Sequence, residues 1–117
     1  LYAKDHLRSA IVIGANETSL DFIKHIEEIP FLLISYHGYF DERDHSRIID
    51  SPDNRFGRHL GSLGDVIAYI HKYNIEMVFI SLPMSSQPRI QKLMDEIPDT
   101  TASVYFLPDI YVFDLKK

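Results

Sequence analysis

The sequence contains no cysteine among its 117 residues. It can therefore form no disulfide, no thiolate metal site and no cysteine nucleophile, and its composition fits a reducing compartment. It also lacks any run approaching the roughly 20 apolar residues that a membrane-spanning helix needs, and its start has no signal-peptide pattern. We predict that residues 1–117 include no membrane span and form a soluble unit.

An excess of positive charge is missing as well. The chain has 12 Lys and Arg against 17 Asp and Glu, which gives a formal net charge of −5. The basic residues are dispersed instead of forming the stripe or patch that binds nucleic acid, so we expect no nucleic-acid partner. A hydrophobic content of 45% over this length is enough for one domain with a real core.

The stretch 9–19 is the most informative part of the chain. A short β-branched apolar run ends at Gly14, and an amphipathic helix pattern follows, which is typical of the first strand, turn and helix of a doubly wound nucleotide-binding fold. The full dinucleotide fingerprint has three glycines. Here only the first is present, because Asn16 and Ser19 replace the other two. The turn is therefore either a ligand site or only a tight structural connection.

The rest of the chain alternates between strand and helix patterns. The expected strands are 10–13, part of 31–40, 59–60, 75–81 and 102–107. The expected helices are one capped by Thr18 or Ser19 and stopped by Pro30, one from about Leu63 to Tyr73 and ended by Asn74, and one capped by Ser85 or Ser86 with Pro88 in its first turn. This order predicts an α/β, Rossmann-like, doubly wound sheet of about five parallel strands in order 3-2-1-4-5, with helices on both faces. Residues 43–58 show no period and are expected to form a long surface loop.

Candidate binding residues follow from the places where the strands end. In a doubly wound sheet the acid that binds a ribose follows the second strand, where Asp41 and Glu42 stand, although a solvated turn acid is the alternative. The candidate set is Gly14, Ala15, Asn16, Glu17, Asp41 and Ser81. A nucleotide or UDP-sugar is the ligand class that such a site would take, and no cofactor is required by these residues.

The residues indicate no catalytic or metal site. Ser81 and Ser85 lack the Gly-x-Ser-x-Gly context of a serine nucleophile, and the six histidines lack metal-ligand spacing. Asp95 and Glu96 are adjacent on a predicted helix and so do not face each other. We therefore expect that the chain itself is not catalytic.

Several motifs together resemble one enzyme family. They are Ile11-Val12-Ile13-Gly14-Ala15, Gly38-Tyr39-Phe40-Asp41-Glu42-Arg43, Leu60-Gly61-Ser62-Leu63, Val78-Phe79-Ile80-Ser81-Leu82-Pro83 and the segment from Ser103 to Leu115. They are similar to the central, CoA-binding-like domain of bacterial polyprenyl glycosylphosphotransferases of the undecaprenyl-phosphate glucose phosphotransferase type. The likeness covers nearly the whole chain, and the last motif is the most specific. Asn16 stands where many members keep glycine.

The resemblance implies a place in a larger protein. Such enzymes pass a sugar 1-phosphate from a UDP-sugar to a lipid carrier, which begins exopolysaccharide or capsule assembly. They have membrane helices first, then a Rossmann-like domain at the cytoplasmic face of the inner membrane, then a catalytic domain. Residues 1–9 would then be a lead-in, 108–117 a connector, and the transmembrane and catalytic domains of the same parent chain would be the partners.

Two functions remain open at this point. One is a non-catalytic regulatory or assembly domain of such a transferase. The alternative is a domain that binds a nucleotide or nucleotide-sugar, either as a sensor or as the amino-terminal domain of a sugar-nucleotide dehydratase. The aromatic residues of 105–113 exceed what one sheet edge covers, so we also expect a homodimer through Ile110 to Phe113 or the fifth strand.

Overall fold

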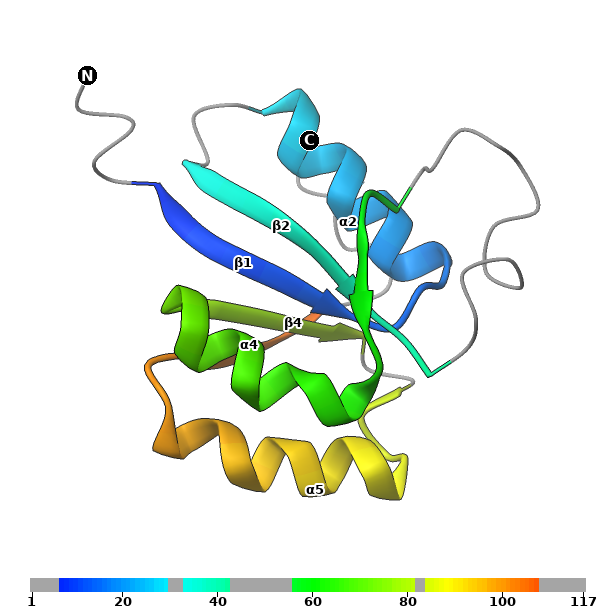
Figure 1. The fold of residues 1–117 in the computed structure, drawn as a ribbon. Helices are drawn as coiled ribbons and strands as arrows, with labels where there is room; N and C mark the ends of the chain where they lie inside the picture. The colour runs from blue at the N-terminus through cyan, green and yellow to red at the C-terminus, as the bar shows by residue number, and fades with distance from the viewer. Residues whose placement is uncertain (1–6, 30–32, 43–55, 82–83, 108–117) are drawn as a thin grey trace.

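A computed structural model describes residues 7–29, 33–42, 56–81 and 84–107. Five parallel strands form one sheet in the order β3-β2-β1-β4-β5 (Figure 1). The strands are β1 (Arg8–Ile13), β2 (Ile34–Phe40), β3 (His59–Gly61), β4 (Met77–Ser81) and β5 (Ser103–Leu107). The predicted fold class and strand order are therefore confirmed.

Strand β1 lies at the centre of the sheet. Its residue Ile11 is in register with Gly38 of β2 on one side and with Val78 of β4 on the other. Every residue of β4 is buried. A parallel strand covered on both faces needs apolar side chains at consecutive positions, which is why β4 has the most continuous apolar run.

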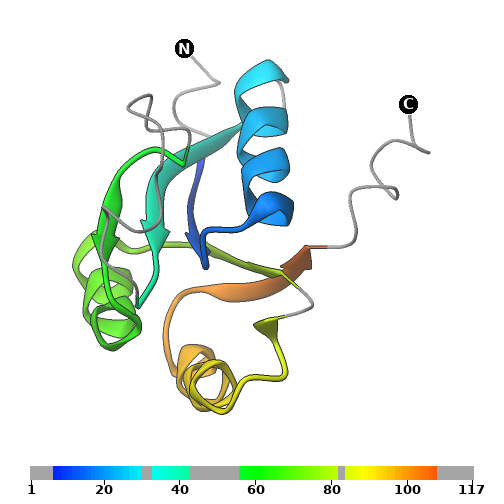
Figure 2. The same cartoon turned by 90° about the vertical axis from the view of Figure 1, so that its right-hand side faces the viewer.

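Helices cover both faces of the sheet, as predicted. Helix α2 (Glu17–Glu28) lies on one face, and α4 (Val66–Tyr73) and α5 (Pro88–Glu96) lie on the other (Figure 2). Two short 3-10 turns, η2 (Leu63–Asp65) and η4 (Ile97–Asp99), adjoin α4 and α5. The helix expected from about Leu63 thus begins as a 3-10 turn and becomes α-helical only at Val66.

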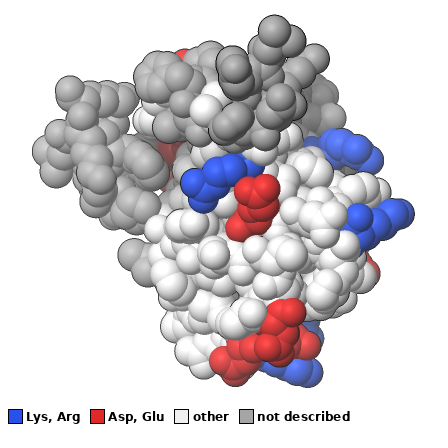
Figure 3. All heavy atoms as spheres, turned by 90° about the vertical axis from the view of Figure 1, so that its left-hand side faces the viewer, with Lys and Arg blue, Asp and Glu red and all other residues white. Residues whose placement is uncertain are grey.

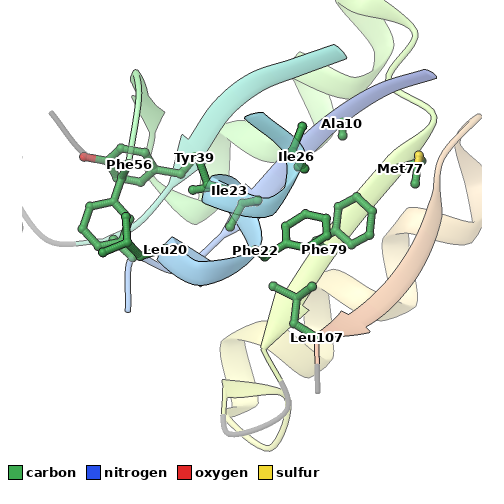
Figure 4. Close-up of a cluster of buried hydrophobic side chains, with 12 residues drawn as sticks. Ala10, Leu20, Phe22, Ile23, Ile26, Tyr39, Phe56, Met77, Phe79 and Leu107 are labelled. Carbon is green, nitrogen blue, oxygen red and sulfur yellow. The ribbon is translucent and has the colours of Figure 1, made fainter. Parts of the chain in front are cut away.

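The core is divided by the sheet into two halves. Along β1, Ala10 and Val12 point into the α2 half, while Ile11 and Ile13 point into the other. In the α2 half the rings of Phe22 and Phe79 pack with centroids 4.3 Å apart (Figure 4). The α4 and α5 half is built from Phe40, Val66, Ile70, Ile75, Val78, Ile80, Ile90, Leu93 and Ile97, with the two isoleucines of β1.

The helix ends differ in part from the sequence predictions. Asn16, and not Thr18 or Ser19, is the N-cap of α2: its side chain accepts a hydrogen bond from the Ser19 backbone N–H at 3.0 Å. Asn16 has the extended backbone that an N-cap needs, whereas Thr18 and Ser19 are already helical. At α5 the residue before the helix is Gln87, so the predicted cap by Ser85 or Ser86 is also wrong.

Other expected boundaries agree with the structure. Pro88 is the first residue of α5, where its missing N–H removes no helical bond. Asn74 ends α4 with a left-handed backbone, φ +53°. The predicted lead-in 1–6, most of the predicted loop (43–55) and the tail 108–117 lie outside the described residues.

Within the described ranges, no helix has both the length and the apolar character needed to cross a bilayer.

Figure 3 shows the end of the molecule that lies to the left in Figure 1. On that side, Lys and Arg are interspersed with Asp and Glu among uncharged residues. This distribution agrees with the dispersed charges of the sequence.

An aromatic cluster lies between β2 and α4. The Nδ1 atom of His37 is 3.0 Å from the Tyr69 hydroxyl, and the His37 ring also meets Tyr73 edge-on. The Lys72 ammonium lies 5.3 Å from the centre of the Tyr73 ring. Burial lowers the pKa of His37 below its usual 6.5, because the charged imidazolium is less well solvated there than in water.

The cluster predicts a pH dependence of stability. Because the folded pKa of His37 is the lower one, the unfolded chain takes up a proton first as the pH falls below about 6.5. The free energy of unfolding should therefore decrease between pH 7 and pH 5 more steeply in the wild type than in His37→Gln, and with equal slope above pH 7. Urea titrations at several pH values measure this, and identical slopes throughout would contradict it.

Candidate functional site

The candidate site lies where the carboxyl ends of β1, β2 and β4 meet. A cleft of about 370 Å³ opens there, and its described lining is Asn16, Asp41, Glu42, Leu63, Met84 and Gln87. In doubly wound sheets, ligands bind in the crevice outside these strand ends, at the point where the strand order reverses. The cleft therefore occupies the position that the fold reserves for ligands.

The turn after β1 depends on Gly14. Its φ of +92° is unfavourable for any residue with a Cβ, and its N–H donates to the Phe40 carbonyl at 2.7 Å. A Cβ at this position would also overlap the Sδ and Cε atoms of Met84. Glycine thus serves both the backbone conformation and the close packing of a methionine over the turn.

Asp41 connects this turn to the second strand. Its side chain accepts a hydrogen bond from the Ala15 backbone N–H at 2.8 Å, and the residue is only 6% exposed. Its own N–H donates to the Gly61 carbonyl at 3.0 Å, which ties the end of β2 to β3. Asp41 is therefore not a solvated turn acid, whereas its neighbour Glu42 is exposed. The carboxylate lies beside the N-terminus of α2, where negative charge is favourable.

Asn16 joins three segments at the floor of the cleft. Besides capping α2, its Nδ2 donates to the Ser81 hydroxyl at 3.1 Å and lies 3.3 Å from the Met84 sulfur. The backbone N–H of Asn16 donates to the Ser19 hydroxyl at 2.9 Å. Ser81, at the end of β4, is 1% exposed. A glycine at position 16 could make none of the contacts of the Asn16 carboxamide.

The structure brings together five of the six candidate residues. Gly14, Ala15 and Asn16 form the turn, and Asp41 and Ser81 bond to it from the ends of β2 and β4. Glu17 is different: its side chain is exposed in the first turn of α2, and no hydrogen bond joins it to the other five.

Sequence analysis missed the ion pair at the edge of the cleft. There Arg89 Nη1 lies 2.8 Å from Glu42 Oε1, and both side chains are well exposed. Lys92 lies one turn further along α5, beside a second hollow. A single arginine in a helix pattern does not indicate a partner 47 residues away. The sequence named only Glu42 in this region, as the alternative to Asp41.

The chemistry of the cleft is that of binding groups. It offers two carboxamides, a buried carboxylate, two apolar side chains and an ion pair at its edge. The structure described here contains no group of three His, Asp or Glu side chains placed to hold a metal. Such a set of groups suits a ligand with hydrogen-bonding edges and apolar faces.

Comparison with known proteins gives three findings. The family model described as a CoA-binding domain matches residues 2–108. A UDP-glucose:undecaprenyl-phosphate glucose-1-phosphate transferase of Klebsiella pneumoniae is 29% identical over 55 residues, which is 47% of this chain and 12% of that protein. The crystal structure of RSP, a Rex-family repressor, superposes with a TM-score of 0.60 over 96% of this chain and 58% of that one, at 14% identity. That last likeness concerns the fold alone.

The Asp41 contact leads to a stability prediction. Asp41→Ala leaves the Ala15 N–H without its buried acceptor, so the free energy of unfolding should fall by about 1–3 kcal/mol. The neighbouring Glu42→Ala removes an exposed ion pair and should cost at most about 1 kcal/mol. Urea unfolding of both variants measures these decreases. Equal decreases in the free energy of unfolding would show that the Asp41 hydrogen bond contributes no more than the exposed ion pair.

Proposed function

The chain belongs to the CoA-binding domain family, and we propose that it acts as a non-catalytic regulatory or assembly domain. The parent protein would be a membrane sugar transferase. It would move glucose 1-phosphate, or a similar sugar 1-phosphate, from a UDP-sugar to undecaprenyl phosphate in exopolysaccharide or capsule biosynthesis. The domain would lie at the cytoplasmic face of the bacterial inner membrane, next to the transmembrane and catalytic domains of the same chain.

One observation carries the non-catalytic part of this proposal. The polar groups at the strand ends bond to one another: Asp41 to the Ala15 N–H, and Asn16 to Ser81 and Ser19. A phosphotransferase site instead directs its charged groups at the substrate and its metal ions. The choice of transferase is supported by the name of the Klebsiella relative, of which this chain spans only a small part.

A second candidate function is favoured by the cleft itself. Its volume of about 370 Å³ lies within the range of small-molecule sites, and it occupies the ligand position of the fold. The domain would then bind a nucleotide or nucleotide-sugar, as a sensor in the transferase or as the amino-terminal domain of a related sugar-nucleotide dehydratase. The two candidates are compatible, because a sensor regulates through the ligand that it binds.

Ser81→Ala in the full-length parent tests the non-catalytic role. Ser81 is the buried hydroxyl at the strand ends, and its loss removes only a partner of Asn16. We expect transfer of labelled glucose 1-phosphate from UDP-glucose to undecaprenyl phosphate in membranes to stay within about threefold. Loss of a group that takes part in proton transfer typically costs about 10²–10⁴-fold. A loss of that size at an unchanged membrane level of the protein would contradict the proposal.

Thermal unfolding of the 117-residue chain with UDP-glucose, UDP, NAD and CoA tests the second candidate. A ligand at 100 times its dissociation constant stabilises the folded state by about 2.7 kcal/mol. A rise in Tm with one of these compounds and not with the others would support a sensor and name its ligand. If none of these compounds raises the Tm, the sensor function is contradicted and only the assembly role remains.

The assembly role includes a homodimer through the edge strand β5. Tyr105 and Phe106 are 38% and 46% exposed, and β5 carries no charged residue that would prevent pairing with a second edge. Phe106→Lys should therefore yield a monomer in sedimentation or light scattering where the wild type is a dimer. Tyr73→Lys, at an equally exposed aromatic on α4, is the control and should remain a dimer. A monomeric wild type would contradict the proposal. The tail residues Ile110 to Phe113 lie outside the described residues.

A further inference from the structure

The cleft at the strand ends continues beyond the ion pair. A second hollow of about 250 Å³ lies against α5 and shares Glu42 and Leu63 with the first. Its other charged lining residues are Arg89, Lys92 and Glu96. The two hollows therefore adjoin each other at Glu42 and Leu63, and we call them together the elongated cleft. Its inner end lies at the α2 turn, and its outer end holds two cations and two carboxylates.

The inner end is poorly suited to a phosphate. In doubly wound folds a phosphate usually lies against the free N–H groups at the start of the helix after β1. Here the Ala15 N–H is bonded to Asp41, the Ser19 N–H to the Asn16 side chain, and the Asn16 N–H to the Ser19 hydroxyl. The side chain of Asp41 is itself acidic. An anion at this turn would therefore find three of its backbone donors occupied, beside a buried carboxylate.

Met84 closes the same place by its shape. Its thioether packs directly on Gly14, where the backbone of a dinucleotide site would approach the pyrophosphate. With Leu63 it gives the inner hollow two apolar side chains, next to the carboxamide of Gln87. These groups suit the uncharged, hydrogen-bonding end of a ligand, such as a nucleobase.

We propose that the cleft binds a phosphate-bearing nucleotide ligand with its anionic end on Arg89 and Lys92 of α5 and its uncharged end near Asn16 and Met84. The anionic group thus lies in the adjoining hollow, away from the α2 turn. This inference rests on the ligand-binding function proposed above, and it adds the orientation of the ligand and the residues that select it.

Without a ligand, the Glu42 carboxylate occupies the position on Arg89 that the anionic group of the proposed ligand would take. Its ion pair with Arg89 joins side chains that are 75% and 41% exposed, so it is weakly held in water. A diphosphate offers more charge and more acceptors to the planar guanidinium than one carboxylate does. Lys92 lies three residues after Arg89 on the same side of α5, within reach of the same group.

Isothermal titration of the 117-residue chain with UDP-glucose, CoA and inorganic pyrophosphate tests the orientation. For whichever of these probes binds, Arg89→Ala should raise the dissociation constant about tenfold. This is the effect expected when a charge-assisted hydrogen bond is lost. Lys24→Ala removes an equal charge from the exposed side of α2 and should have no effect. Circular dichroism checks that each variant is folded.

Two acidic residues provide a matched pair of variants. Glu42→Gln frees Arg89 and should strengthen binding about two- to fivefold, the value of an exposed ion pair. Glu17→Gln removes an acid beside the α2 N-terminus and should leave binding unchanged. Strengthening by Glu17→Gln, with no effect of Arg89→Ala, would overturn the orientation and leave ligand binding intact. No binding of any probe at millimolar concentration would overturn both.

Discussion

The hydrogen bond between the Ala15 N–H and the Asp41 carboxylate links two segments 26 residues apart, at the carboxyl ends of β1 and β2. Its partners are almost fully buried, so breaking it would leave a donor with no water to replace the carboxylate. The bond holds the β1 turn against the end of β2. The position of the α2 N-terminus, and hence the inner end of the cleft, depends on this contact.

The same contact changes what the turn can bind. In a dinucleotide fold the helix N-terminus is left open for a phosphate, whereas here protein side chains accept hydrogen bonds from three of the turn's N–H groups. Asn16 completes this arrangement because it caps α2 and also reaches Ser81 of β4. For the ligand proposed above, the anionic group would then have to be bound elsewhere. Among the described residues, the cations that line the adjoining hollow are those of α5.

The fold could be predicted because its signals are local and repeated. Each strand and helix carries its own apolar period, and right-handed crossovers then restrict the strand order. The caps were harder to predict, because Asn16, Thr18 and Ser19 are all good N-cap residues. Which of them has the extended backbone depends on where the turn is held, and that is decided by Gly14 and Asp41.

The sequence by itself determined the doubly wound architecture, and it identified the turn at Gly14 and Asp41 as candidate binding residues. The hydrophobic period and the placement of glycine involve residues only a few positions apart, so both can be recognised in the sequence. Only the tertiary structure decided that Asp41 is buried on Ala15, that Met84 covers Gly14 and that Arg89 meets Glu42. These contacts join residues far apart in the chain, so their geometry exists only after the sheet has brought the strand ends together.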